Sequence, residues 1–421
     1  MPIELPGPES VALTAEGSEI RPMRTLWLLS ASHAVNHAQA AVLPLVYLAI
    51  IPEFQLGVAA IAFLTAIGNL AAGLVQLSYA AVTRFLSRRA ILSLGGLLFG
   101  GGMAGQALAN SIVPFSVANI ASRIGGSPQH PVGNALLSEQ FPAHRRGFAI
   151  ATHIAGGNVG TVAVPLLGAW LIASVGWRST VVFFGLPAIV IALAIFVFVR
   201  ESGADRAAAR AYGSLRRAFG VVLRDRSLLL IFLSTVLAGG GRGLGVLNIL
   251  VPLYLKLVVG LDDGTVALMY TVLLSGSVPG PVVAGWLSDR VGRKPLIIAA
   301  YAGGAAALAV FVLAGSNVLG LWLGILLLAT FNFVESPQLQ ALLSDVTPPA
   351  LRDASFAIYF TLAFVSGSLW VLLYGAVVEN LGNALGLSVS FVIMAVAFVV
   401  AASVVVPIRL DQGDASKLSA P

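Results

Sequence analysis

The chain has 421 residues, of which 58% are hydrophobic and only 10% are charged, and its mean hydropathy is +0.93. A soluble domain carries about 25% charged residues, so this composition predicts an integral membrane protein. The formal net charge of +6 is spread over short basic pieces between apolar runs, which disfavours a nucleic-acid partner. The absence of cysteine excludes disulfides and thiolate metal ligands.

The first 24 residues carry four glutamates ahead of two arginines, unlike a secretory signal, and we expect a cytosolic tail there. A bilayer core about 30 Å thick needs roughly 20 apolar residues of helix. The apolar runs that follow are continuous, whereas the strands of a membrane barrel alternate. The sequence therefore predicts twelve membrane-spanning helices, near residues 25–50, 57–82, 90–109, 112–137, 147–173, 178–199, 227–256, 264–288, 295–315, 317–343, 354–378 and 385–407.

Lysine and arginine determine the predicted orientation, because cytosolic loops are enriched in them. With a cytosolic N-terminus, inner loops and tails hold 20 of the 24 basic residues. Arg178 and Lys256 then lie outside, and Arg123 and Arg242 lie within the membrane. The segment 200–226, with seven arginines and three acidic residues, is expected to lie along the anionic inner leaflet. We expect a bacterial-type inner membrane with both termini in the cytosol.

Two stretches of the chain repeat at the same displacement. SPQHPVGNALLSE at 127–139 recurs as SPQLQALLSD at 336–345, with ALLS displaced by 206 positions, and TRFLSRR at 83–89 recurs at the same displacement as DRVGRK at 289–294. A shared displacement at two separate places predicts two six-helix bundles of common origin, as in some transporters. We therefore expect an all-α membrane fold with two pseudo-symmetric bundles, divided into a tail (1–24), a bundle (25–199), a linker (200–226), a bundle (227–407) and a tail (408–421).

Twelve spans, a repeat and a basic middle segment resemble the major facilitator superfamily, and GWLSDRVGRKP at 285–295 resembles a loop signature of that family. The resemblance implies a gating latch at this loop, formed by Gly285, Asp289, Arg290, Arg293 and Lys294. It also implies that helices 1, 4, 7 and 10 line a central cavity. The first-half copy has Thr83 where the acid belongs, which predicts a weaker latch there.

Within that superfamily, SHAVNHAQAAVLPLVY at 32–47 and the stretch 125–171 resemble fosmidomycin-resistance-type exporters. His37 and Val132 stand where that family usually has an Asp and a Glu. GGNVGTVAVPLLG, within the same stretch, resembles a glycine-proline motif associated with antiporters, which favours export. The shared elements are His33, Asn36, His130-Pro131, Gly156-Gly157-Asn158, Gly160 and Pro165.

Polar residues inside the predicted spans are the candidates for a transport site. Arg123, Ser127, His130 and Asn134 fall within about 60° of one another on a helix. A lipid-facing arginine costs about 2.5–3.5 kcal/mol on insertion scales, so we expect this stripe to line an aqueous cavity. The alternative is that these residues pair with neighbouring helices.

The first span contains His33 and His37, four residues apart, with Asn36 beside them. Such a pair can bind a metal, but no cysteine or carboxylate accompanies it, so we predict no metal site. Proton exchange or substrate hydrogen bonding is favoured, and interhelical hydrogen bonding is the alternative. The glycines of GGGRGLG around Arg242 are expected to allow close helix packing, because no strand precedes them as in a nucleotide loop.

The resulting hypothesis is a proton-coupled exporter of a small anionic or polar organic compound or drug, working by alternating access. We expect substrate binding by Arg123, Arg242, His37, Asn36 and Asn134, and proton coupling by Glu335, His33, His130 and His153. A proton-coupled uptake symporter for an organic anion such as a carboxylate, and a non-transporting sensor with a transporter fold, are the alternatives. An enzyme is disfavoured, since no catalytic spacing is present. The expected partners of a monomer are its substrate, protons and the bilayer, with no cofactor.

Overall fold

The computed structural model describes residues 19–56, 58–242 and 246–408. Its elements over these ranges are α-helices and short 3-10 helices, which confirms the predicted all-α fold. Most of the two predicted tails, 1–24 and 408–421, lies outside the described residues.

The first half of the chain contains the first six predicted spans. Its fourth span is interrupted where Pro128 and Pro131 follow one another closely, since proline lacks the N–H that a continuing helix needs. Gly176, with φ at 78°, joins the fifth and sixth spans within one continuous element, in a conformation that favours glycine. The elements are α1 (Pro22–Glu53), α2 (Val58–Val82), α3 (Arg88–Gly105), η1 (Gln106–Leu108), α4 (Ile112–Gly126), η2 (Ser127–Gln129), α5 (Pro131–Gln140) and α6 (Ala143–Phe198).

The second half repeats this plan after two short helices in the linker. The eighth and tenth of its predicted spans are each built from two helices separated by a short break, and the seventh contains two helices on either side of a segment that includes residues 243–245, outside the described ranges. The elements are α7 (Ala204–Ala211), α8 (Leu215–Val222), α9 (Arg226–Ala238), α10 (Asn248–Leu257), α11 (Asp263–Ser275), α12 (Pro279–Val291), α13 (Arg293–Leu313), α14 (Val318–Phe331), α15 (Glu335–Val346), η4 (Pro349–Leu351), α16 (Arg352–Leu381) and α17 (Asn383–Val405).

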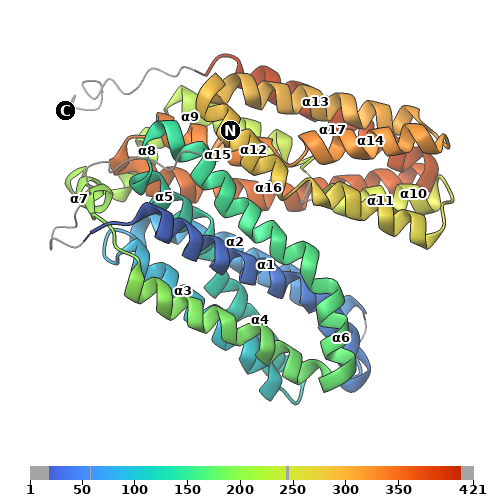
Figure 1. The fold of residues 1–421 in the computed structure, drawn as a ribbon, viewed down its shortest axis with the longest axis horizontal. Coiled ribbons are helices and arrows are strands. Elements are labelled where there is room, and N and C mark those ends of the chain that lie inside the picture. The colour runs from blue at the N-terminus through green and yellow to red at the C-terminus, as the bar shows by residue number, and fades with distance from the viewer. Residues whose placement is uncertain (1–18, 57, 243–245, 409–421) are drawn as a thin grey trace, which may run out of the picture.

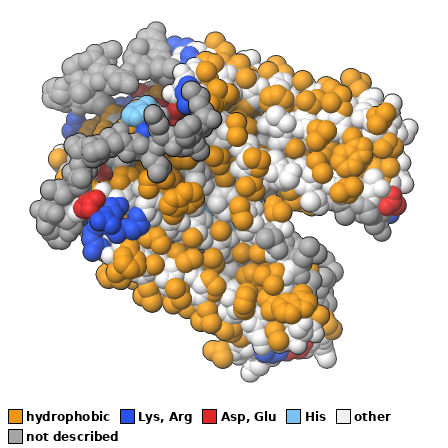
Figure 2. All heavy atoms as spheres, in the orientation of Figure 1, with side chains coloured by type: hydrophobic (Ala, Val, Ile, Leu, Met, Phe, Trp, Pro, Cys, Tyr) orange, Lys and Arg blue, Asp and Glu red, His pale blue; other side chains and the backbone are white. Residues whose placement is uncertain are grey.

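The outer surface of the molecule has the apolar character that lipid requires. Within the described residues, seven helices are long and apolar enough to cross a membrane by length and composition. Large hydrophobic side chains cover both arms of the molecule, whereas blue and red charged groups gather near α7 (Figure 2). Leu108 and Leu313, for example, are 88% and 85% exposed. A water-soluble protein rarely exposes so continuous an apolar surface.

The helices form two arms, α1–α6 and α9–α17, that meet at one end and diverge at the other (Figure 1). The space-filling view shows a notch between the diverging arms (Figure 2). We call the end that carries α7 and α8 the closed end and the opposite end the open end. Toward the closed end, α6 packs on α12 and α15, and α5 packs on α16.

Equivalent residues of the two repeats meet where the arms touch. The Asn134 amide nitrogen donates a hydrogen bond to Gln340 Oε1 at 2.5 Å, and both residues are buried. Their positions differ by 206, the displacement of the sequence repeat. Two equivalent residues can touch only near the axis that relates the repeats, so this contact marks the pseudo-two-fold axis.

The helices α12 and α6 approach each other closely at two glycines, Gly285 and Gly147, one on each arm. A Cβ added at Gly285 on α12 would lie 2.7 Å from the carbonyl oxygen of Gly147 and 2.8 Å from the Ala151 side chain on α6. Carbon atoms do not approach that closely without a shift of the backbone. A glycine at position 285 is therefore required for α12 to rest on α6.

We expect Gly285→Leu to force α12 away from α6 and to separate the arms at the closed end. Because the chain has no cysteine, spin labels introduced by Phe85→Cys and Val291→Cys would report one distance across that end. Both positions are exposed, one on each arm. Gly375→Leu is the control, since a Cβ there meets nothing within 4 Å. An identical distance distribution for both variants would contradict the prediction.

Candidate functional site

Two neighbouring cavities have volumes of about 360 and 430 Å³: the first lies within the first arm and reaches the second arm only at Phe364, and the second lies between the arms. Both are lined by His37, His130 and Phe364, and we call the two neighbouring cavities together the vestibule. The polar lining of the first cavity includes Asn36, Gln39, Asn69, Gln76, Arg123 and Thr161. The polar lining of the second includes His33, Asn158, Arg242, Asn332, Gln340 and Tyr359.

Arg123 holds its guanidinium in the first cavity with neutral partners alone among the described residues. Its Nε donates to Asn119 Oδ1 at 3.0 Å, and its two terminal nitrogens donate to Asn69 Oδ1 at 2.6 Å and to Tyr47 Oη at 3.2 Å. A Cβ at Gly68 would overlap the arginine stem at 2.4 Å from Cδ, so glycine makes room for this side chain. The positive charge of Arg123 is thus held in place without being neutralised.

Arg242, in contrast, is paired with an acid. Its Nε donates to Glu335 Oε1 at 2.8 Å, and a terminal nitrogen donates to Thr235 Oγ1 at 3.0 Å. Glu335 is 1% exposed, and its second carboxylate oxygen has no hydrogen-bond partner. A buried carboxylate is tolerated when it is paired, so the arginine stabilises the charge of Glu335.

The glycines beside Arg242 have the packing role expected from the sequence. A Cβ at Gly240 would lie 2.9 Å from the Trp370 ring and from Tyr374 Oη, and one at Gly241 would lie 2.9 Å from Phe398. The Tyr374 hydroxyl donates to the Gly240 carbonyl oxygen at 2.9 Å. These glycines let aromatic side chains approach the broken helix that presents Arg242 to the second cavity.

Four histidines from three parts of the chain form one cluster, and three of them, His33, His37 and His130, line the vestibule. The His33 ring centroid lies 4.6 Å from that of His37, 4.6 Å from that of His130 and 4.5 Å from that of His153. His33 and His37 lie on α1, His130 lies between η2 and α5, and His153 lies on α6. The sequence placed these residues on different spans, and the fold brings their rings into one cluster.

The two asparagines expected to bind substrate lie in different surroundings. Asn36 lines the first cavity, and its amide nitrogen donates to the Gly126 carbonyl oxygen at 3.1 Å. Asn134 is fully buried in its contact with Gln340 and is absent from the lining of the two cavities. Of the predicted polar stripe, Arg123, Ser127 and His130 line the first cavity, and Asn134 lies at the contact between the arms.

The loop after α12 contacts the first arm directly. Asp289 accepts hydrogen bonds from the backbone N–H groups of Gly147 and Phe148, at 3.2 and 3.0 Å. Arg293 donates to Asp289, to Asp345 Oδ2 at 3.0 Å and to the Ala143 carbonyl oxygen at 2.7 Å. Asp289 and Arg293 therefore tie α12 and α13 to the start of α6.

The other two charged residues of this loop contact the second arm. The Arg290 guanidinium carbon lies 3.5 Å from the centroid of the Trp286 ring, a cation–π contact. Lys294 Nζ donates to the carbonyl oxygens of Val406 and Ile408, at 2.8 and 2.7 Å. In this state, Arg290 and Lys294 are anchored within their own half.

The first half lacks an acid at position 83, yet it has an ionic network of its own centred on Arg88, and the weaker latch expected there stays a prediction. This buried arginine binds Glu139 at 2.6 Å, Asp205 at 3.1 Å and Asp353 at 3.0 Å. Asp205 lies on α7 of the linker and also binds Arg352, so the linker supplies an acid that position 83 lacks. We call Arg88, Glu139, Asp205, Arg352 and Asp353 the closed-end network.

Part of this network could have been found from the repeat. Glu139 and Asp345 are separated by 206 positions, and their partners Arg88 and Arg293 are separated by 205, so the Arg88–Glu139 and Arg293–Asp345 pairs correspond to within one position. The role of Asp205 has no such signal, because the linker has no counterpart in the repeat. Sequence analysis also missed two residues that line the vestibule, Asn69 and Tyr359. Each is a polar side chain within an apolar run, and that pattern could have identified them.

We expect Asp205→Asn to weaken the closed end, since Arg88 and Arg352 would lose one of their acids. Loss of a buried hydrogen-bond partner costs about 1–3 kcal/mol, and about 1.4 kcal/mol changes a population tenfold. The label pair at positions 85 and 291 would show a larger share of separated arms.

The matched control is Asp225→Asn, the same change in the same linker. Asp225 caps α9 by accepting from the Leu228 N–H, and asparagine caps a helix equally well. Equal distance distributions for the two variants would remove Asp205 from the gate.

Comparison with known families gives one model that covers most of the chain. The model of the Major Facilitator Superfamily matches residues 29–371 and 231–419.

Curated relatives match about half of the chain and about half of their own length. The cis,cis-muconate transport protein of Acinetobacter baylyi is 25% identical over 215 residues, which are 49% of this chain and 51% of the relative. The multidrug resistance protein MdtG of Salmonella typhimurium is 26% identical over 219 residues, 51% of this chain and 48% of the relative.

Solved structures match along nearly the whole chain. The proton:xylose symporter XylE bound to 6-bromo-6-deoxy-D-glucose has a TM-score of 0.74 at 18% identity, covering 91% of this chain and 94% of that one. FucP in its outward conformation has a TM-score of 0.77 at 15% identity, covering 91% and 98%. At these identities the likeness concerns the fold.

Proposed function

This chain belongs to the Major Facilitator Superfamily, and from that premise we propose that it is a proton-coupled secondary transporter of a small organic anion. The observation that carries the proposal is the Arg123 guanidinium, which faces the vestibule with neutral partners. The described chain offers it no carboxylate, so an anionic substrate would complete its electrostatic environment.

The balance of charge in the vestibule supports an anion. Arg242 is compensated by Glu335, and no acid within the described residues compensates Arg123, which leaves one positive charge in the vestibule. An anion in a low-dielectric cavity interacts with such a charge more strongly than it does in water. Relatives named for cis,cis-muconate and for 4-hydroxybenzoate, both carboxylates, are consistent with this substrate class.

The two ends of the molecule support alternating access. The closed-end network and the Arg293 contacts hold the arms together at one end, while the arms diverge at the other. We place the closed end in the cytosol of the inner membrane, since it carries most of the arginines, and both termini with it. The arms would correspond to residues 25–199 and 227–407, and rocking them about the Asn134–Gln340 contact would expose the vestibule to each side in turn in a monomer.

The Arg242–Glu335 pair supports proton coupling. Protonation of Glu335 would remove its charge and leave Arg242 free to bind an anion. Proton and anion would then bind to the same state, which couples their movement in the same direction. This geometry favours symport.

Export by antiport is the second candidate, and sequence features favour it. The GGNVGTVAVPLLG stretch of α6, the partial resemblance to fosmidomycin-resistance-type exporters and the similarity to MdtG multidrug resistance proteins point to drug or anion efflux. The two candidates differ in the sign of coupling. With acid outside, a symporter accumulates the anion inside vesicles, and an antiporter expels it.

We expect Arg123→Gln to lower anion affinity about tenfold to a hundredfold, because a hydrogen bond to a charged group contributes about 1.5–3 kcal/mol. The measurement is calorimetric binding of cis,cis-muconate and 4-hydroxybenzoate to the purified protein. Arg178→Gln is the control: this arginine lies at the open end, where its hydrogen bond lowers the pKa of Glu53. Retained affinity in Arg123→Gln would refute the anion site.

We expect Glu335→Gln to abolish accumulation driven by a pH gradient and to preserve exchange of internal for external anion. Glutamine is a neutral mimic of the protonated acid, so the pair with Arg242 would stay broken at every pH. Both activities can be measured in proteoliposomes with labelled 4-hydroxybenzoate. Gradient-driven accumulation by the variant at the wild-type rate would exclude Glu335 as the proton carrier.

A further inference from the structure

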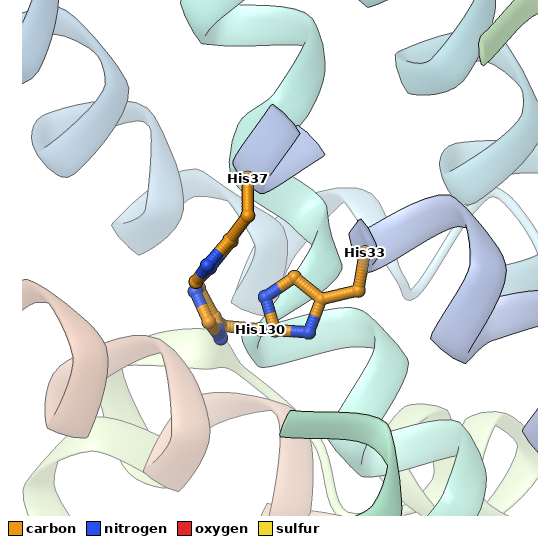
Figure 3. A group of neighbouring side chains, drawn as sticks. All are labelled: His33, His37 and His130. Carbon is orange, nitrogen blue, oxygen red and sulfur yellow. The ribbon is translucent and has the colours of Figure 1, made fainter. Parts of the chain in front are cut away.

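Three of the clustered histidines point their rings toward one another at the wall of the vestibule (Figure 3). His33, His37 and His130 each offer one ring nitrogen, and these nitrogens lie within 4.8 Å of one another. His37 and His130 line both cavities, and His33 lines the second. The cluster is therefore open to whatever enters the vestibule.

The hydrogen bonds of His33 fix the state of its ring. Its Nδ1 lies 3.0 Å from the carbonyl oxygen of His153, and a carbonyl oxygen can only accept, so Nδ1 carries the hydrogen. Its Nε2 is buried and has no hydrogen-bond partner. In the neutral ring, Nε2 carries a lone pair that points into the cluster and accepts no hydrogen bond. An unsatisfied buried polar atom of this kind requires an explanation.

The rings of His37 and His130 are also held in place by neighbouring residues, and each leaves one nitrogen available for a ligand. His37 Nδ1 lies 3.0 Å from Thr161 Oγ1, which orients the ring and leaves Nε2 for another partner. His130 Nδ1 is buried and without a partner, and its ring stacks on Phe360 at a centroid distance of 5.1 Å. Metal-binding histidines typically use one nitrogen for the ion and the other for such an orienting hydrogen bond.

We propose that His33, His37 and His130 form a binding site for a divalent transition-metal ion of the Zn²⁺, Co²⁺ or Ni²⁺ type. Nitrogens that share a tetrahedral ion at about 2.0–2.1 Å lie about 3.4 Å apart, so modest ring rotations would complete the site. Three protein ligands leave a fourth position open, and here it faces the vestibule. Imidazole ligands suit these metals and do not suit Mg²⁺ or Ca²⁺.

The third ligand, His130, reverses the expectation of no metal site that was drawn from the sequence. His33 and His37 alone gave a pair without further ligands, and metal binding was disfavoured for that reason. The fold adds His130, which is 93 positions further along the chain than His37. A bound ion would join α1 to the junction of η2 and α5, both within the first arm, and would stand where the two cavities meet.

The decisive experiment is a Co²⁺ titration of the purified full-length protein, followed by visible absorption. Four-coordinate Co²⁺ gives intense absorption bands, whereas six-coordinate Co²⁺ on a protein surface gives weak ones. We expect intense bands that saturate at one ion per chain and that Zn²⁺ displaces. Weak bands alone, or no binding, would overturn the proposal.

Variants assign the ion to this cluster. His37→Asn and His130→Asn should each abolish the intense bands. Thr161→Val, which removes only the orienting hydroxyl, should weaken binding about 10–100-fold. His144→Asn is the matched control, since His144 is the exposed fifth histidine outside the cluster, and it should bind Co²⁺ like the wild type.

Wild-type affinity in His37→Asn and His130→Asn would place the ion elsewhere and refute the site. X-ray absorption of the wild-type protein loaded with Zn²⁺ provides a measurement that needs no variant, and it should show three imidazole ligands; one or none would refute the site as well. Neither experiment depends on transport, so failure of the metal site leaves the proposed function standing, and the reverse also holds.

Discussion

A polar group within a bilayer must find its partner inside the protein, and this constraint organises the whole molecule. Leucine, valine and phenylalanine cover the outer faces of both arms, and charged side chains collect at the closed end. Of the embedded charges that remain, Arg123 lines the first cavity, Arg242 lines the second, and the buried Glu335 pairs with Arg242. A vestibule lined by polar side chains gives these charges partners inside the protein, away from lipid.

The two halves have the same arrangement of helices but contribute different polar residues to the vestibule. Asn134 and Gln340, equivalent by the repeat, meet near the pseudo-two-fold axis, and the pairs Arg88–Glu139 and Arg293–Asp345 correspond to within one position. In the vestibule the symmetry is lost: the first half contributes an arginine with neutral partners and a cluster of histidines, and the second contributes an ion pair. The ion pairs at the closed end are thus similar in the two halves, whereas the polar residues of the vestibule differ between them. This combination is consistent with a transporter that changes between two states around one substrate.

The sequence predicted the fold in more detail than the site. Apolar runs of about 20 residues and a repeat displaced by 206 positions were enough for the spans and the two arms. Breaks within spans, at residues 239–241 and 332–334, were harder to place, because apolar residues lie both before and after them. Helical periodicity grouped Arg123 with His130, but it could not show that His33 faces His130 or that Asp205 reaches Arg88. Those contacts depend on how distant segments pack, which no local pattern records.

The linker helix α7 has a consequence for the balance between the two states. Asp205 holds α7 against residues of both arms, and Arg210 Nε donates to the Arg84 carbonyl oxygen at 2.5 Å. Ordering a residue costs about 1–2 kcal/mol of backbone entropy, and α7 has eight residues. Parting the arms at this end would return that freedom to the chain. The conformational entropy of the linker would therefore favour separation of the arms at this end, and the salt bridges of Asp205 would oppose it.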